Sequence, residues 1–128
     1  MARTRSFRDL QAWQKSMQLA RNVYRLTETF PKTEMFGLLT QMRRAAVSVP
    51  SNIAEGHGRL SDNSFRVFLA RARGSLFELE TQIQLALDLG YISTNDAEEI
   101  TEFCREVGRI LNGLIRATNA GVAASPSR

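Results

Sequence analysis

Cysteine, histidine, lysine and proline are all scarce in this sequence of 128 residues. Its single cysteine, Cys104, and single histidine, His57, cannot form an internal disulfide or supply a zinc ligand set, which suits a reducing compartment. No apolar run reaches the roughly 18 to 20 residues that span a bilayer, and no apolar signal segment follows the charged start. These absences predict a cytoplasmic protein without a membrane segment or a covalent cross-link.

Arginine supplies most of the positive charge, since only Lys15 and Lys32 among the 17 basic residues are lysines. Guanidinium groups bind phosphate through paired, forked hydrogen bonds. The charge is also divided along the chain: residues 1–73 hold 13 basic and 5 acidic side chains, whereas residues 74–128 hold 4 and 8. Net charges of +8 and −4 predict either an anionic partner or subunits that meet positive face to negative face.

Apolar residues recur every three or four positions, and no sustained alternation of β-branched residues occurs, so the sequence predicts an all-α fold. Four helices are expected, over about 7–29, 33–55, 61–89 and 93–120. Pro50 lies inside the second of them and predicts a kink there. The short connections predict an antiparallel up-down-up-down four-helix bundle over 7–120, with a basic arm over 1–6 and an unstructured tail over 121–128.

The first helix carries two apolar rows on opposite faces. Leu10 and Leu19 are nine positions apart, which corresponds to about 180° around a helix. The row of Leu10, Trp13, Met17, Ala20 and Tyr24 is expected to face the bundle core. The opposite row, together with apolar residues outside the main stripe of the third helix, exceeds what one small bundle buries, which predicts self-association. The expected subunit interface comprises Leu19, Val23, Leu26, Phe30, Val67, Phe77 and Leu85.

Three segments, 7–31, 36–59 and 68–92, carry a family resemblance. Their most specific parts are Arg43-Arg44-Ala45-Ala46 followed by PSNIAEG at 50–56, and GSL at 74–76 followed by ELET at 78–81. With these motifs the chain resembles, over roughly residues 7–116, the four-helix bundle family named for the intervening sequences of 23S ribosomal RNA.

The resemblance implies a four-helix protomer, and relatives in that family assemble as rings of five. Some relatives are encoded inside insertions of ribosomal RNA genes, and a similar basic bundle is the accessory protein of the reverse transcriptase of diversity-generating retroelements. The resemblance therefore implies binding to RNA or DNA, with a reverse transcriptase or another protein as a further partner. It supplies no catalytic residues, because none is established for the family.

Phosphate binding requires clustered and exposed cations. The candidate residues are Arg3, Arg5, Arg8, Arg43, Arg44, Arg66, Arg71 and Arg73. Aromatic residues do not alternate with these arginines at positions expected to be exposed, so recognition of the phosphate backbone and its shape is favoured over base stacking. The alternative is that the arginines form a solvated face or pair with acidic residues of a neighbouring subunit.

Few residues suggest metal binding. Glu55, Glu78 and Glu80 lie in the motif segments, but a di-iron bundle also needs two Glu-x-x-His pairs, and the sequence has none. Glu55 and Glu78 are expected instead to accept hydrogen bonds from Arg43 or Arg44, or from the backbone near Pro50.

Catalytic motifs are also missing. His57 lies between two glycines, as a turn residue does, and no arginine precedes it at the spacing of four to six that helical-bundle ribonucleases use. Cys104 lies on the apolar stripe of the last helix, which predicts packing rather than nucleophilic catalysis. The glycines around His57 are not followed by Lys-Ser/Thr, so they form no P-loop. The sequence predicts no enzyme, no metal and no cofactor.

Two hypotheses follow. The first is a homopentameric basic bundle that binds RNA or DNA through its phosphate backbone. The second is a structural adaptor that docks a protein partner and uses its divided charge for ring assembly.

Overall fold

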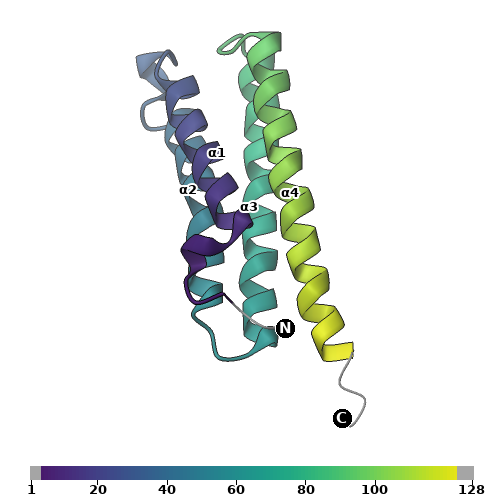
Figure 1. Ribbon diagram of the computed structural model, residues 1–128. Coiled ribbons are helices and arrows are strands. Elements are labelled where there is room, and N and C mark those ends of the chain that lie inside the picture. Colours follow the sequence, from purple (N-terminus) through teal and green to yellow (C-terminus); the bar gives the residue numbers. More distant parts are fainter. Residues whose placement is uncertain (1–3, 124–128) are drawn as a thin grey trace.

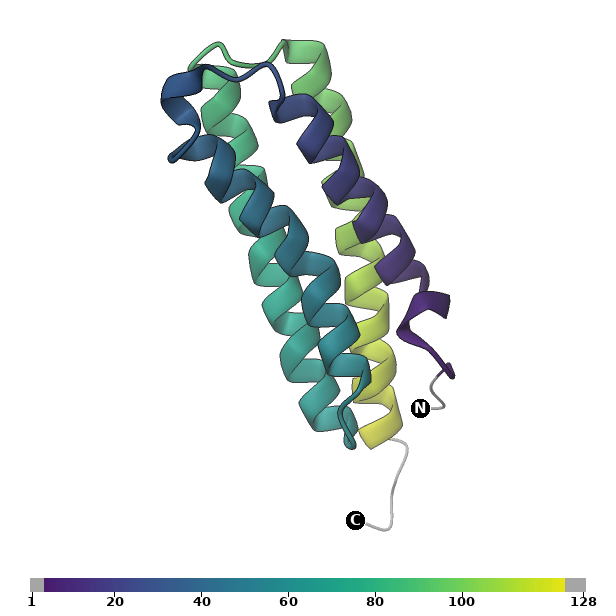
Figure 2. The same ribbon diagram turned by 90° about the vertical axis from the view of Figure 1, so that its left-hand side faces the viewer.

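The computed structural model describes residues 4–123, and the side chains of residues 4–119. Its elements are η1 Phe7–Asp9, α1 Gln11–Thr27, η2 Lys32–Glu34, α2 Leu38–His57, α3 Asp62–Asp88 and α4 Thr94–Ala123. In Figures 1 and 2 the chain reverses direction after each long helix, so that α1 to α4 lie alongside one another. Residues 4–123 contain no strand, and the predicted all-α four-helix bundle is confirmed.

Two helix boundaries differ from the prediction. α4 continues to Ala123, so the predicted end of the bundle at residue 120 is wrong, and the first three residues of the predicted tail are helical. Residues 124–128 lie outside the described part of the chain. α2 begins at Leu38, rather than near Thr33 as predicted. The short turn η2 occupies the intervening residues.

Glu34 explains why α2 begins where it does. Its Oε1 accepts a hydrogen bond from the backbone N–H of Leu38 at 2.9 Å, and its Oε2 accepts one from the Tyr91 hydroxyl at 2.8 Å. The first bond satisfies an N–H group that has no partner within the helix. The second joins the α1–α2 connection to the α3–α4 connection. The Leu38 N–H, followed by the Tyr91 hydroxyl, lowers the pKa of Glu34, because both bonds stabilise the charged carboxylate.

A lowered pKa in the folded state makes stability depend on pH. The contribution of Glu34 is present above its unfolded pKa, near 4.5, and is lost as the pH falls through the lower folded value. We expect Glu34→Gln, which keeps an acceptor but removes the charge, to reduce the loss of stability between pH 7 and pH 3 in urea unfolding. Glu98→Gln, which removes an exposed carboxylate near the same end, is the matched control. If the free energy of unfolding changes with pH in the same way in the wild type and in Glu34→Gln, this role of Glu34 is contradicted.

α2 continues through Pro50 as far as His57, which is helical rather than part of the turn that the sequence predicts. The kink near Pro50 stays a prediction. Beyond it, α2 lies very close to α3: a Cβ placed on Gly56 would be 2.6 Å from Cβ of Phe68 and 3.0 Å from Cδ1 of Phe65. These distances are shorter than van der Waals contact, so only glycine allows the two helices to approach this closely at that point.

The orientation of α1 is the main correction to the predicted packing. Leu19, Val23 and Phe30 are buried in the core of the protomer, so their assignment to a subunit interface is wrong. Trp13 is only partly buried, and Tyr24 remains 44% exposed, although the sequence analysis places both on the inward face. The periodicity identifies two apolar rows correctly. The row of Leu19, Val23 and Phe30 faces the core, whereas of the other row only Ala20 is buried there.

Small and hydroxyl side chains on the Leu19 face of α1 explain this orientation. Ala12 and Ser16 leave room for the neighbouring helices. The Ser16 hydroxyl donates to the Trp13 carbonyl at 2.9 Å, and the Thr27 hydroxyl donates to the Val23 carbonyl at 2.8 Å. Because each hydroxyl is satisfied by its own helix, burying this face leaves these polar groups paired.

The other row of α1 lines an open groove of about 690 Å³ between α1 and α2, which we call the α1–α2 groove. Its apolar residues are Phe7, Trp13, Met17, Ala20, Tyr24, Val47, Pro50 and Ala54. A second hollow, of about 480 Å³, shares Tyr24 and Val47 with the first and continues it toward Leu39 and Met35. Apolar side chains therefore remain accessible along much of the outer face of these two helices.

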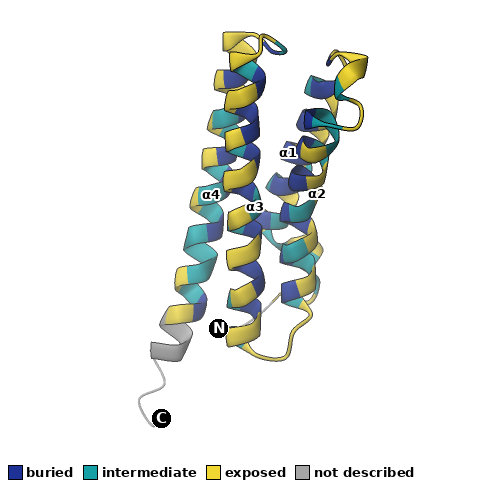
Figure 3. Cartoon of the chain, turned by 180° about the vertical axis from the view of Figure 1, so that it is seen from behind, coloured by how far each residue is buried: buried dark blue, intermediate teal, exposed yellow. Residues whose placement is uncertain are grey.

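Apolar side chains are also exposed on α3. Val67, Phe77 and Leu85 are 51%, 56% and 47% exposed, which leaves them available for the predicted subunit contact, whereas Leu26 packs partly against the core. Figure 3 shows that exposed residues recur along the whole of α3. We call Val67, Ala70, Gly74, Phe77 and Leu85 the α3 outer row.

Candidate nucleic-acid interface

The N-terminal arm is attached to the end of α2. Nε2 of His57 lies 2.9 Å from the carbonyl oxygen of Thr4 and 3.2 Å from its hydroxyl. The hydroxyl of Ser6 caps η1 by accepting from the backbone N–H of Arg8 at 3.1 Å. Arg5 and Arg8, both exposed, are thus held at the end of the bundle where α2 connects to α3.

Two further arginines meet at this end around one aromatic ring. The guanidinium carbons of Arg59 and Arg71 lie 4.4 Å and 4.7 Å from the ring centre of Phe68. Arg59 comes from the α2–α3 connection, whereas Arg71 and Phe68 lie three residues apart on one face of α3. Such stacking engages the flat face of a guanidinium, whereas phosphate binds to the N–H groups at its edge. The ring therefore holds both cations close together at this end of the bundle.

Arg66 lies on the first turns of α3 and donates a hydrogen bond to the side chain of Asn63. Its Nη1 is inaccessible to solvent and has no hydrogen-bond partner among the described residues. An unpaired guanidinium N–H is costly unless something accepts from it. We call Arg5, Arg8, Arg59, Arg66 and Arg71 the basic end.

Three of the predicted phosphate-binding arginines, Arg43, Arg44 and Arg73, lie away from the basic end. Arg43 donates to the Thr27 hydroxyl at 2.9 Å and to the Tyr24 carbonyl at 3.2 Å, and it stacks over the Tyr24 ring. It therefore joins α2 to α1, rather than pairing with Glu55 or Glu78 as the sequence analysis expects.

Arg44 is exposed beside the α1–α2 groove. Arg73 donates to Asn112 at 3.1 Å and links α3 to α4. Arg3 lies outside the described residues. The structure thus gathers only part of the predicted set at one end of the bundle.

Arg59 is not among the phosphate-binding arginines that the sequence predicts. Its neighbours Gly58 and Leu60 give no periodic signal, and its partner Phe68 lies nine residues away across a turn. Only the close approach of α2 and α3 near Gly56 brings the two side chains together.

Charge is divided between the two ends of the bundle. At the opposite end, α3 and α4 carry four exposed carboxylates around the α3–α4 connection, which we call the acidic end. They belong to Asp88, Asp96, Glu98 and Glu99. At the basic end the carboxylates are Asp9, Glu55 and Asp62. The basic end and the acidic end together give the bundle a polarity of exposed charge along the helix axes.

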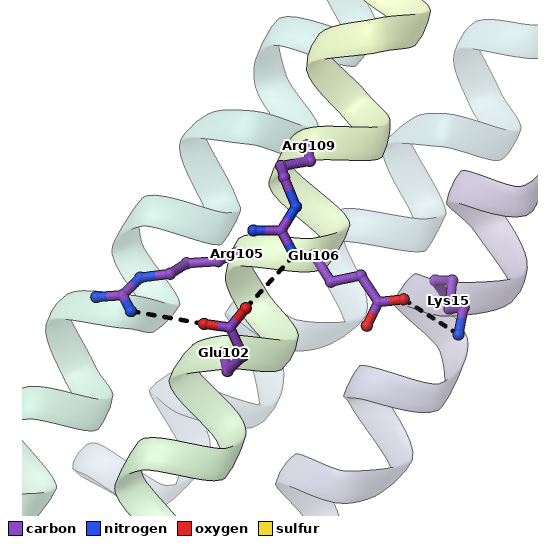
Figure 4. Close-up of polar contacts among 5 residues, drawn as sticks. All are labelled: Lys15, Glu102, Arg105, Glu106 and Arg109. Atoms are coloured by element: carbon purple, nitrogen blue, oxygen red, sulfur yellow. Dashed lines mark hydrogen bonds and ion pairs between the residues drawn. The ribbon is translucent and has the colours of Figure 1, made fainter.

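Arg105 and Arg109 of α4 differ from the cations of the basic end, because both pair with a carboxylate. Glu102 pairs with Arg105 at 3.6 Å and Arg109 at 3.4 Å, and Glu106 pairs with Lys15 of α1 at 3.3 Å (Figure 4). By contrast, Arg5, Arg8 and Arg71 form no ion pair with a carboxylate within residues 4–119.

The remaining reactive groups offer little chemistry. Burial raises the pKa of Cys104 to about 12, with a smaller effect from the charge of Glu80, so its nucleophilic thiolate is disfavoured at neutral pH. No group of three or more histidine, cysteine, aspartate or glutamate residues in the described part could hold a metal ion. None of the helices within the described residues has the length and apolar character needed to cross a membrane.

The fold and the basic end define an arginine-rich, all-helical bundle. The sequence matches the family model of the 23S rRNA-intervening sequence protein over residues 8–113, so the chain belongs to that family, as the motifs predict. No protein of curated function matches it significantly.

A crystal structure similar to this fold is that of a protein with unknown function from the S23 ribosomal protein family of Bacteroides thetaiotaomicron VPI-5482. The TM-score is 0.73 at 23% sequence identity, and the match covers 81% of this chain and 97% of the other. At that identity the likeness concerns the fold alone.

Proposed function

We propose that the protein is a non-enzymatic, homo-oligomeric bundle, expected to be a pentamer, that binds RNA or DNA through the phosphate backbone. The observation that carries this proposal is the pair of arginines that both lie close to the Phe68 ring, at a basic end where Arg5 and Arg8 pair with no carboxylate of residues 4–119. In a closed cyclic ring all protomers point the same way along the symmetry axis. If the bundles stand along that axis, their basic ends gather on one face.

The arrangement favours phosphate contacts over base reading. Phe68 is 7% exposed and covered by two guanidinium groups, so it offers no free face for a base. Ordered arginines without accessible aromatics suit a structured RNA or a duplex, in which phosphates are regularly spaced and bases are stacked. We propose that these residues bind structured nucleic acid with little sequence preference.

Binding to a labelled RNA hairpin and to a DNA duplex, measured across a salt series with the oligomer mass in parallel, tests the proposal. We expect the logarithm of the association constant to fall linearly with the logarithm of salt concentration, because each phosphate contact releases about 0.9 counterion from B-DNA. Binding by an oligomer at low salt, lost between about 50 and 200 mM, supports the proposal.

An oligomer that binds neither ligand at 50 mM salt would contradict nucleic-acid binding and leave the adaptor as the better hypothesis. A reverse transcriptase or another protein would then be the class of partner to test. A monomeric mass at all concentrations would contradict the ring.

A further inference from the structure

We propose that the subunits meet through two different surfaces, with the α3 outer row of one copy seated in the α1–α2 groove of the next. This inference rests on the proposed ring. A contact between identical patches closes at two copies, so a ring of five requires two complementary surfaces on each protomer. The α1–α2 groove and the α3 outer row are both apolar and accessible among the described residues.

The two surfaces match in length. Residues that line the α1–α2 groove and its continuation extend along α2 from Leu39 to Ala54, which at 1.5 Å per residue is roughly 22 Å. The α3 outer row extends from Val67 to Leu85, roughly 27 Å. One helix laid along the other two would therefore cover both surfaces over most of their length.

Their shapes also correspond. The groove is hollow and apolar, whereas α3 is a ridge that carries small residues in the N-terminal half of its outer row: Ala70 and Gly74 lie between Val67 and Phe77. A Cβ placed on Gly74 meets nothing within 4 Å, so the protomer itself does not require glycine there. Glycine in an exposed helix interior is unfavourable relative to alanine, and a helix interface with small residues allows a close approach of the backbones.

The charges beside the surfaces are opposite over much of the contact. Arg21, Arg25 and Arg44 border the groove, where Glu28 is the acidic residue. Beside the C-terminal half of the α3 outer row lie the exposed carboxylates of Glu78 and Asp88. Arg71 lies beside the N-terminal half of the α3 outer row, near the basic end. Pairing the acidic half of α3 with the arginines of the groove selects one direction of docking.

Complementation between two variants tests the contact without knowledge of its register. Val47→Arg places a charge in the groove, and Gly74→Trp places a large ring on the α3 outer row, where the protomer has open space. We expect each variant alone to raise the protein concentration needed for assembly by at least about 30-fold, as the loss of an interface hot spot does. An equimolar mixture should form a 1:1 dimer, because each variant retains the surface that the other has lost.

Other outcomes identify other contacts. If Gly74→Trp still assembles like the wild type, the α3 outer row is not part of the contact and two grooves meet instead. If Val47→Arg still assembles like the wild type, the groove is not part of the contact and two α3 outer rows meet instead. A mixture of the two variants that stays monomeric would also overturn the proposal. Circular dichroism verifies that the variants fold, and Ser51→Arg, at an exposed groove position, replaces Val47→Arg if that variant does not. A monomeric wild type contradicts the ring, and with it this contact. If the two variants complement each other but the protein binds no nucleic acid, the subunit contact stands and only the proposed nucleic-acid ligand is contradicted.

Discussion

Replacing Arg59 and Arg71 together by glutamine is expected to weaken binding to an RNA hairpin or a DNA duplex by about 10- to 100-fold near 0.1 M salt. The two guanidinium groups are ordered on the Phe68 ring, so each loses little freedom on binding a phosphate. Each lost contact lowers the slope of log affinity against log salt by about 0.9 on B-DNA. Fluorescence anisotropy across a salt series measures both quantities.

The matched control is the double variant Arg105→Gln and Arg109→Gln. It removes the same formal charge from exposed positions on α4, where both arginines pair with Glu102. We expect its affinity to fall by much less and its salt slope to change little, because these cations are away from the basic end. Equal losses in the two double variants would mean that net charge, rather than the basic end, determines binding.

The second large effect concerns stability. Gly56→Ala is expected to lower the free energy of unfolding by about 2 to 3 kcal/mol, although alanine favours helix by roughly 1 kcal/mol over glycine. The new methyl would lie 2.6 Å from Cβ of Phe68, an atom fixed to the α3 backbone, so one helix must move. In a chain of this size the change should lower the melting temperature by about 10 °C. Urea and thermal unfolding measure it.

Gly58→Ala is the control for this prediction. It lies two residues further along the same segment, and its Cβ would be 3.6 Å from the carbonyl oxygen of Glu55, an ordinary contact. Its effect should remain within about 0.5 kcal/mol, as for surface substitutions away from special features. If both variants are equally unstable, the helical propensity or mobility of this segment, rather than the close approach of α2 to α3, is responsible.

Much of this fold could be predicted because each helix carries its own signals. α3 begins after the N-cap Ser61, whose hydroxyl accepts from the backbone N–H of Ser64 at 3.0 Å, and it ends before Gly90, which has a φ of 77°. These positions were identifiable from residue types alone. The motifs around Arg43 and Gly74 likewise indicated the family that the comparison confirms.

The faces of α1 could not be assigned in the same way. Its two apolar rows have similar periodicity, and the choice between them depends on which row fits against α2 and α4. Buried Ser16 and Thr27 were the missed signal, since small residues beside Leu19 and Val23 permit close helix packing. Aromatic size misled the prediction, because Trp13 and Tyr24 have large apolar areas but line the groove. The Arg59 contact was equally invisible, since it depends on tertiary structure.

The polarity between the basic and acidic ends has a consequence for the kinetics of encounter. Opposite charges separated along the bundle give the protomer an electric dipole moment. In the field of a polyanion that dipole turns the basic end forward while the molecules are still diffusing, which increases the fraction of productive collisions. Mobile ions shorten the reach of this field to about 8 Å at physiological ionic strength. Salt should therefore act on the association rate through the orientation of the approaching bundle, before any phosphate is touched.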